Sequence, residues 1–511
     1  MISRIPKIFP KLTVKPHILA IDQGTTGTRA FLFNAQGRLC SSAYQEIRQY
    51  FPKPGWVEHD PLEIWNSVCA VVRTALNQAR LKPSSIAAIG ITNQRETTVV
   101  WDAVSGRPLH RAIVWQDRRT SVFTESLKKR GLEKKLREKT GLVSDPYFSA
   151  SKLTWLLEHV PGLRAQAARG RARFGTIDTW LVWKLTGGRA HITDYTNASR
   201  TLLFNIRTRD WDSALLKLFK VPASILPQAA DSGSIFGKTA ASGPWVEGIP
   251  IASILGDQQA SLYGQSCYAA GDVKNTFGTG AFLMMNIGKK YRRPPFGLLT
   301  TLACDRDGKS VYAFEGAIFM AGAVMQWLRD GLKILGSAAE SEKIASTVQS
   351  EGVVLIPAFA GLGSPYWEPR VRGALLGITR GTGRAQVIRA ALESMAHQTA
   401  DVVEAMQAGA GYPMRALGAD GGASRNRLLM QMVSDYLQKP VRAVNQADST
   451  AWGAAKLAGH TVGLWRNLAS LDARQKFRIY TPKRSAKVVQ QDRERWKNAV
   501  SLLLNSAETF A

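Results

Sequence analysis

The chain has 511 residues, a length that favours two large domains over a single core. Apolar residues make up 45% and charged residues 21%, which excludes a disordered protein, and no apolar run approaches the roughly 18 residues that cross a bilayer. The formal charge of +28 suggests nucleic acid, but the basic stretches, such as 128–139 and 164–173, lack interleaved aromatics, which favours a basic solvated surface and no specific nucleic-acid partner.

Residues 1–17 are basic and contain three prolines, but they have neither a long apolar stretch nor a small-residue cleavage site. We therefore expect a flexible basic tail and no signal peptide. The four cysteines, Cys40, Cys69, Cys267 and Cys304, show no CxxC spacing. This argues against disulfides and a zinc site and favours a reducing, cytoplasmic location.

The first predicted strand, residues 18–21, leads into a turn rich in glycine and threonine, residues 22–28, and a second strand follows over residues 30–33. Glycines let backbone N–H groups converge on an anion, so the turn is a candidate phosphate site. An ordinary tight hairpin turn is an equally good interpretation. A helix is predicted to begin at Asp60-Pro61, with the aspartate as N-cap.

Polar residues crowd the segment Asn93-Gln-Arg-Glu-Thr-Thr98, between predicted strands at 86–91 and 99–101. Arg95 and Glu96 offer a donor and an acceptor that suit a small polyol. An exposed turn with an internal ion pair is the competing interpretation. Further along, Trp115 and Tyr147 are candidates for the walls of the same site, although such residues also serve as plain core.

Asp257 follows an apolar strand, residues 251–255, and is followed by Gln258 and Gln259. Ligands of open α/β sheets collect at the carboxyl ends of strands. A carboxylate at this place can accept a hydroxyl proton during phosphoryl transfer, or help to hold Mg²⁺ through water. A cap of the following helix is the structural alternative.

The strand–turn–strand pattern returns in the second half, with strands at 273–277 and 281–285 around Gly278-Thr-Gly280. The repeat predicts two related α/β domains, at residues 18–265 and 266–511. Two glycine-rich turns at matching places favour a nucleotide clamp over two unrelated hairpins.

The second half also offers a candidate adenine pocket. A helix predicted around residues 319–328 places Gly322 and Gln326 on one face, and the segment 420–426 links a short strand to a helix with Gly422 and Asn426 four apart. Bare glycine positions suit a flat ring, but helix packing explains them equally well. After about residue 460 we expect a basic surface helix.

These motifs resemble the glycerol kinases of the FGGY carbohydrate kinase family over residues 18–465. Asn93-Gln-Arg-Glu-Thr-Thr98 and Asp194-Tyr-Thr-Asn-Ala-Ser-Arg200 carry the resemblance most specifically. It implies an α/β fold of two ribonuclease-H-like domains, as in actin and hexokinase, around a central cleft. It also implies ATP-dependent phosphorylation of glycerol to glycerol 3-phosphate with Mg²⁺, and a homo-oligomer, either a dimer or a tetramer.

The resemblance assigns roles to individual residues, with Asp257 as the general base. The residues implied for glycerol are Arg95, Glu96, Trp115, Tyr147, Asp257, Gln258 and Phe282. Those implied for ATP are Thr25, Thr26, Gly27, Arg29, Thr279, Gly322, Gln326, Gly422 and Asn426, and those implied for Mg²⁺ are Asp22 and Asp257. Gly27 stands where many members carry serine, which removes one hydroxyl contact.

Two rival functions stay open from the sequence: a kinase of another small polyol or sugar, and an ATPase of the actin or chaperone type. The loop Ala240–Ile249 bears on regulation. It contains no arginine to bind a phosphate, and Glu247 would repel one. We therefore expect no control by fructose 1,6-bisphosphate through this loop.

Overall fold

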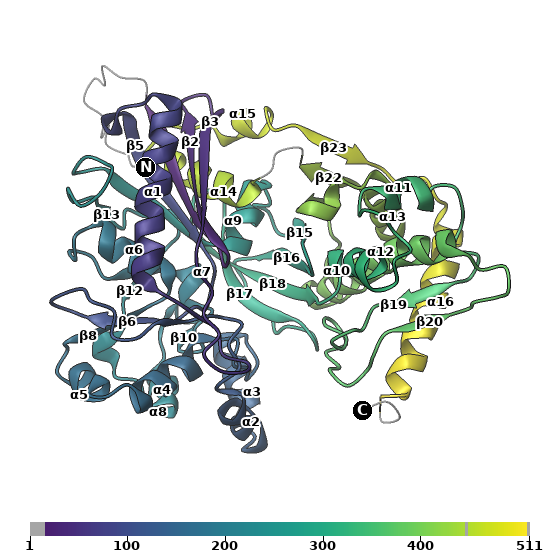
Figure 1. Cartoon of the computed structure of the whole chain (residues 1–511), viewed down its shortest axis with the longest axis horizontal. Coiled ribbons are helices and arrows are strands. Elements are labelled where there is room, and N and C mark those ends of the chain that lie inside the picture. The colour runs from purple at the N-terminus through teal and green to yellow at the C-terminus, as the bar shows by residue number, and fades with distance from the viewer. Residues whose placement is uncertain (1–15, 445–447, 508–511) are drawn as a thin grey trace. The chain divides into compact units, whose positions relative to one another are not determined.

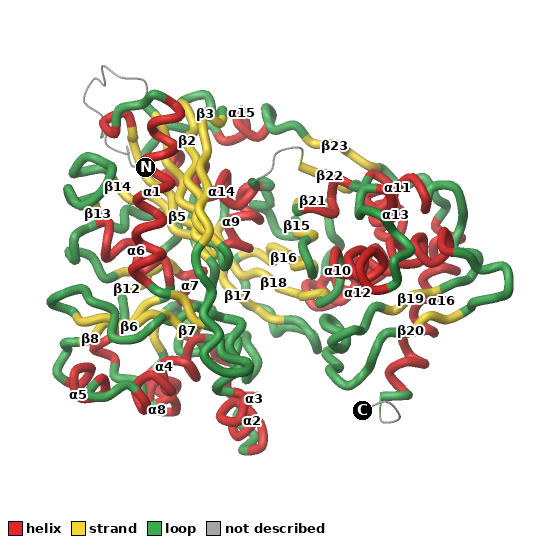
Figure 2. Tube along the Cα trace, viewed as in Figure 1, coloured by secondary structure: helices red, strands yellow, loops and turns green. Residues whose placement is uncertain are grey.

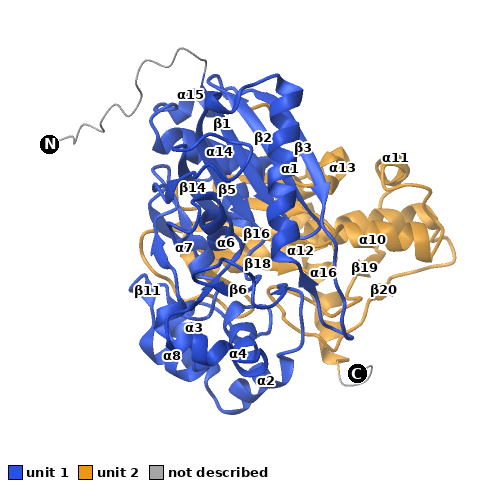
Figure 3. Cartoon of the chain, turned by 60° about the vertical axis from the view of Figure 1, so that its left-hand side comes forward, with its two compact units in different colours: residues 1–268, 301–312, 448–474 blue, residues 269–300, 313–447, 475–511 orange. Residues whose placement is uncertain are grey.

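The computed structural model describes residues 16–444 and 448–507, so most of the predicted tail lies outside the described residues (Figure 1). The chain forms two compact units (Figure 3). Unit 1 comprises residues 1–268, 301–312 and 448–474, and unit 2 comprises residues 269–300, 313–447 and 475–511. The predicted boundary near residue 265 stays a prediction. No helix within the described ranges is long and apolar enough to cross a membrane.

Unit 1 is organised around a six-stranded sheet of order β13-β14-β5-β1-β2-β3. β1 pairs antiparallel with β2 and parallel with β5, β2 pairs antiparallel with β3, and β5 pairs parallel with β14. The strands are β1 (His17–Gln23), β2 (Gly27–Asn34), β3 (Leu39–Glu46), β5 (Ile86–Asn93), β13 (Gly237–Lys238) and β14 (Pro250–Gly256).

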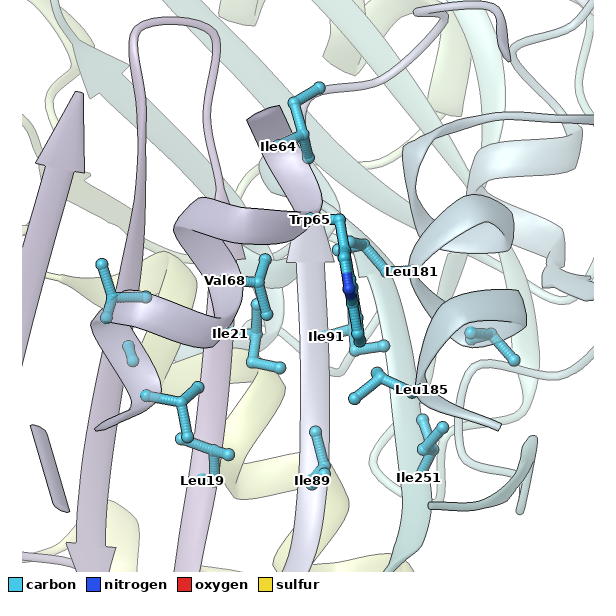
Figure 4. Packing of buried hydrophobic residues seen from close by; sticks show 14 of the residues in the cluster. Leu19, Ile21, Ile64, Trp65, Val68, Ile89, Ile91, Leu181, Leu185 and Ile251 are labelled. Atoms are coloured by element: carbon cyan, nitrogen blue, oxygen red, sulfur yellow. The ribbon is translucent and has the colours of Figure 1, made fainter. Parts of the chain in front are cut away.

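Helices cover both faces of the central part of this sheet. Successive side chains of a strand point to opposite faces, so the side chains of β1 are buried on both sides. On β1, Leu19 and Ile21 pack in a core with α1 (Pro61–Ala79) and α6 (Ile177–Leu185), as Figure 4 shows. Ile18 and Ala20 pack in a second core with α9 (Asp257–Gly264) and α14 (Ser449–Thr461). An uninterrupted apolar strand therefore indicates a sheet covered by helices on both sides.

Two features fix these helices locally. The carboxylate of Asp60 accepts a hydrogen bond from Leu62 N at 2.8 Å and caps α1, as predicted. α9 and α14 approach each other closely through glycine: a Cβ at Gly453 would lie 1.9 Å from Ala260 O. Even an alanine is therefore too large at this helix contact.

Unit 2 contains a seven-stranded sheet of order β17-β18-β16-β15-β21-β22-β23. Its central strands repeat the pattern of unit 1, since β15 pairs antiparallel with β16 and parallel with β21, and β21 pairs parallel with β22. The repetition confirms the predicted pair of ribonuclease-H-like domains. The strands are β15 (Val273–Phe277), β16 (Ala281–Gly288), β17 (Leu299–Cys304), β18 (Ser310–Ile318), β21 (Leu417–Asp420), β22 (Val441–Val444) and β23 (Phe477–Tyr480).

Helices and short strands complete the two units (Figure 2). In unit 1 they are β4 (Glu58–His59), β6 (Val99–Asp102), β7 (Ala112–Ile113), α2 (Ser121–Lys129), α3 (Glu133–Thr140), α4 (Ser149–His159), α5 (Leu163–Ala168), β8 (Ala172–Gly175), β9 (Ile192–Asp194), α7 (Tyr195–Ala198), β10 (Phe204–Asn205), β11 (Asp210–Trp211), α8 (Ser213–Phe219), β12 (Gln228–Ala230) and α15 (Leu468–Asp472). In unit 2 they are α10 (Gly322–Gln326), α11 (Glu340–Ala345), β19 (Val354–Ile356), β20 (Ala374–Leu376), α12 (Arg384–Ala410), α13 (Arg427–Leu437) and α16 (Ala486–Asn505).

The predicted helix around residues 319–328 is wrong in its extent. β18 continues to Ile318, α10 begins only at Gly322, and a π-helical turn follows over Trp327–Gly331. Phe319 lies after the end of this strand and before the helix, and its side chain is exposed, so it does not belong to a buried helical face. In the C-terminal region the sequence predicted α16 but not the edge strand β23.

Candidate functional site

The turn between β1 and β2, the first candidate phosphate site, is held by side chains from elsewhere in unit 1. Gln49 Nε2 donates to the carbonyl oxygen of Thr25 at 2.8 Å, and Trp115 Nε1 donates to Thr25 Oγ1 at 2.9 Å. Gly24 N donates to Gly27 O at 2.9 Å, while the side chain of Thr26 is exposed. The turn is therefore fixed and also accessible to a ligand, and Trp115 links it to the predicted polyol wall.

Gly27 begins β2 directly after the turn. A Cβ at this position would lie 2.5 Å from Tyr44 Cε2 and 2.6 Å from Gln45 O. A serine therefore does not fit beside Tyr44 without movement of β3. Arg29, on the same strand, lies over the Tyr44 ring at 5.3 Å and pairs with Asp448 at 3.0 Å.

Arg95 and Glu96 are buried, with exposed fractions of 3% and 1%, so the interpretation as an exposed turn is wrong. Glu96 has a φ of 63°, a strained conformation that persists only where the surroundings hold it. Its Oε1 accepts from Arg200 Nε at 2.5 Å, and its carbonyl oxygen accepts from Ser149 Oγ at 2.9 Å. These contacts fix the carboxylate within a cluster of two arginines.

Asp257 is the first residue of α9, at the carboxyl end of β14. Its Oδ1 lies 3.2 Å from Arg95 Nε and accepts from the backbone N–H of Gln258 at 2.7 Å. The N-cap position belongs to Gly256, where a Cβ would lie 2.7 Å from Arg95 Cδ. Glycine therefore lets Arg95 reach Asp257, whose side chain is 36% exposed.

The two predicted aromatic walls are in contact. Trp115 and Tyr147 meet edge to face, with ring centroids 5.5 Å apart, and both are partly exposed. Behind them Lys152 is fully buried and its Nζ donates to the carbonyl oxygen of Tyr147 at 2.5 Å. Burial lowers the pKa of Lys152 to about 7, against the opposing effect of Glu96 and other carboxylates.

Asp22 lies at the end of β1 among other carboxylates. Burial, then Asp448 and more weakly Asp257, raise its pKa to about 7, while Arg29 opposes the shift. The described residues contain no group of three His, Cys, Asp or Glu side chains with metal-holding geometry. A pair of neighbouring carboxylates without a full cage suits Mg²⁺, which keeps several water and phosphate ligands.

Unit 2 contains a cavity of about 450 Å³ between α10, α12 and the start of α13. Five residues predicted for ATP line it: Thr279, Gly322, Gln326, Gly422 and Asn426. Its apolar lining, which the sequence did not predict, includes Met325, Leu392, Met395 and Leu429. Apolar walls with a few polar groups are typical of a site for a flat organic ring.

The glycines of this cavity have different roles. A Cβ at Gly322 would lie 2.6 Å from Gly278 O, and one at Gly421, with φ +86°, would lie 2.3 Å from Phe277 O. A Cβ at Gly422 would meet no heavy atom of the described residues within 4 Å. The first two permit close backbone packing, whereas Gly422 leaves open space in the cavity wall.

The structure thus brings the predicted residues together within each unit. Phe282 lies on β16, opposite Thr276 of β15, so its role beside Trp115 stays a prediction. Sequence reasoning did not assign Arg200, Lys152 or Asp448. Arg200 closes the Asp194–Arg200 motif, which was the one available signal for it.

Sequence profiles of the FGGY family of carbohydrate kinases match residues 17–264 for the N-terminal domain and 273–462 for the C-terminal domain. The chain belongs to this family. It is 51% identical to a glycerol kinase of Bacillus mycoides over 95% of this chain and 99% of the relative, and 51% identical to one of Carboxydothermus hydrogenoformans over 95% and 98%.

Solved structures of FGGY kinases agree in fold. The Plasmodium falciparum glycerol kinase with ADP superposes with a TM-score of 0.92 at 34% identity, covering 96% of this chain and 99% of that one. A gluconate kinase from Lactobacillus acidophilus gives 0.86 at 20% identity, with 97% and 99% covered, which shows the fold alone.

Proposed function

We propose that this FGGY kinase transfers the γ-phosphoryl group of ATP to a terminal hydroxyl of glycerol, giving glycerol 3-phosphate and ADP. The observation that carries the proposal is the buried Arg95–Glu96 pair held against Asp257. The glycerol kinases that are about 50% identical over nearly their whole length support it.

Arg95 and Glu96 bind the glycerol hydroxyls, one as donor and the other as acceptor, and Tyr147 also binds a hydroxyl, while Trp115 contacts the carbon atoms. Because Glu96 is held by Arg200, its position does not depend on the ligand. Such prior organisation reduces the entropy lost on binding. Gln258, beside the base on α9, and Phe282, on β16, complete the proposed set.

Asp257 accepts the proton of the attacking hydroxyl. Its contacts with Arg95 Nε and with the backbone N–H of Gln258 both use Oδ1, which supports a role for Oδ2 as the proton acceptor. Proton removal by a placed carboxylate supports in-line attack on the phosphorus. The turn at Thr25, Thr26 and Gly27, with Arg29 beside it, holds the phosphates, and the cavity of unit 2 holds the adenosine.

Asp22 and Asp257 are the proposed holders of Mg²⁺, the former through water. When bound, Mg²⁺ neutralises charge on the phosphoryl oxygens. Burial is the largest cause of the raised pKa of Asp22, and the charges of Asp448 and Asp257 add to it, so a cation bound there would favour the ionised carboxylate. A cytoplasmic location and a dimer or tetramer stay predictions, the latter to be measured by light scattering.

The decisive experiment measures ADP release with and without glycerol, followed by a panel of small polyols and sugars. We expect ADP release to depend on glycerol and to be fastest with it. Turnover of ATP that is independent of any polyol would favour an ATPase instead, and faster turnover of another polyol would correct the substrate.

A further inference from the structure

A second hollow of unit 2, of about 720 Å³, lies along α11, the first turns of α13 and β23. Four cations line it: Lys343 on α11, Arg427 on α13, and Arg478 and Lys483 on and after β23. We call this hollow the basic groove.

The cations of the basic groove are not neutralised by neighbours. Each is exposed, and none makes an ion pair with a carboxylate of the described residues. Some exposed arginines of unit 2 have acidic partners, as in Arg329–Asp330 and Arg370–Glu368, whereas Arg380 and Arg384 have none among the described residues. The groove differs from Arg380 and Arg384 in that its cations line one hollow. Four cations against the single carboxylate of Glu342 leave this concave surface with an excess of positive charge, which attracts a multiply charged anion.

Glu342 connects the basic groove to the cavity proposed for adenosine, because it lines both. Its Oε2 accepts from the backbone N–H of Arg427 at 2.9 Å, at the N-terminus of α13. Next to it, Asn426 Nδ2 donates to Ser341 Oγ at 3.1 Å. Two hydrogen bonds therefore tie α11, a shared wall, to the first turn of α13.

We propose that the basic groove binds a small anion carrying two or more phosphate groups, and that its occupancy changes the affinity of the neighbouring cavity for a nucleoside. A single phosphate leaves most of the four cations unpaired, whereas a longer polyanion reaches several of them. A phosphate near α13 also competes with Glu342 for the N–H of Arg427, since helix N-termini favour anions. Loss of that bond frees α11 to shift against the cavity.

Binding is tested by calorimetric titration of inorganic tripolyphosphate without Mg²⁺. The test variant is Lys343→Gln/Arg478→Gln, and the control is Lys134→Gln/Lys135→Gln on α3, which removes the same charge outside the groove. We expect binding roughly tenfold weaker in the test variant and unchanged in the control. Binding of tripolyphosphate at the phosphate turn of unit 1 gives a separate component of the titration curve, and the test variant retains this component. If tripolyphosphate binding weakens equally in both variants, or weakens in neither, the proposed anion site in the basic groove is wrong.

Coupling is tested by titrating adenosine with and without saturating tripolyphosphate. Adenosine carries no phosphate, so it does not compete with the anion directly. We expect its affinity to change by at least about fivefold in the wild type and not in Lys343→Gln/Arg478→Gln. An unchanged affinity in the wild type overturns the coupling. The proposed coupling rests on the proposed nucleotide cavity. If that cavity does not bind a nucleoside, adenosine binds under neither condition, so the two failures are distinguishable.

Discussion

The two sheets share the order of four central strands, β2-β1-β5-β14 and β16-β15-β21-β22, but present different chemistry at the ends of these strands. In unit 1 the groups at the ends of β1, β5 and β14 are charged, and Arg95, Glu96 and Arg200 are buried and paired with one another. In unit 2 the corresponding region contains glycines beside methionine and leucine side chains. The same scaffold thus supports a rigid charged site where position matters, and an open apolar one where a ring needs space.

The role of the charged site of unit 1 is tested most strongly at Asp257. Asp257→Asn removes the proton acceptor and keeps the shape of the side chain, so we expect turnover to fall by roughly 10²–10⁴-fold. Asp210→Asn, on the exposed β11, is the matched control and should leave turnover unchanged. Steady-state kinetics on folded protein decide the matter. Near-normal turnover of Asp257→Asn would remove this residue from the mechanism.

Glu96→Ala tests whether the ion pairs of Glu96 with Arg95 and Arg200 make the charged site of unit 1 rigid. Loss of Glu96 should weaken glycerol binding by roughly 1–3 kcal/mol while leaving ATP binding little changed. It also leaves Arg200 without its carboxylate, so the free energy of unfolding should fall by about 3–5 kcal/mol. Glycerol KM and urea denaturation measure the two effects. An unaltered KM for glycerol would show that the pair is structural only.

Gly422→Val tests the open site of unit 2. A Cβ added there meets no atom of the described residues within 4 Å and faces the cavity, so stability should hold while the KM for ATP rises by roughly tenfold. The glycerol KM should stay constant. Gly421→Ala is the contrasting variant, because its Cβ meets Phe277 O and its φ is positive, and it should lower the Tm. If Gly422→Val leaves the KM for ATP unchanged, adenosine binds elsewhere.

Lys152 gives a pH-dependent prediction for unit 1. Its folded-state pKa of about 7 lies below the ordinary value of 10.5, so between these values the unfolded chain holds a proton that the folded chain has lost. The free energy of unfolding should therefore rise with pH above 7, by up to about 1.4 kcal/mol per pH unit from this group. Lys152→Met should remove that slope and raise the glycerol KM slightly through Tyr147, whereas Lys135→Met should do neither. If Lys152→Met keeps the same slope of unfolding free energy against pH, other groups cause that slope.

The smallest expected effect concerns the loop at residues 240–249. Glu247 pairs with Arg189 at 3.1 Å, and Trp245 is buried with its Nε1 donating to Ala240 O at 3.0 Å. The loop is thus packed on its own unit and offers a carboxylate to an incoming phosphate. We expect millimolar fructose 1,6-bisphosphate to cause no inhibition through this loop at physiological ionic strength, and any effect through the basic groove to be lost in Lys343→Gln/Arg478→Gln. Strong, saturable inhibition that persists in Lys343→Gln/Arg478→Gln would contradict this.

The sequence predicted those features of the fold that depend on residues close together in the chain. The cap at Asp60 and both strand–turn–strand units could be predicted, because a capping side chain and a short apolar run beside a glycine-rich turn act over a few positions. Glu96 and Arg200 are 104 residues apart, and no local pattern pairs them. The helix around 319–328 failed because an apolar strand and its following turn imitate helical spacing over so few residues.

The placement of α14 has a consequence for the order of folding during synthesis. This helix covers one face of the unit 1 sheet, yet its residues, 449–461, follow residues 269–300 and 313–447, most of unit 2, in the chain. Domains usually fold in the order in which the ribosome releases them. Here the first unit begun is completed late: α9 begins to cover Ile18 and Ala20, but the cover is complete only when residue 461 has emerged. The newly made chain therefore exposes an apolar sheet face for most of its synthesis, at a stage when chaperones act.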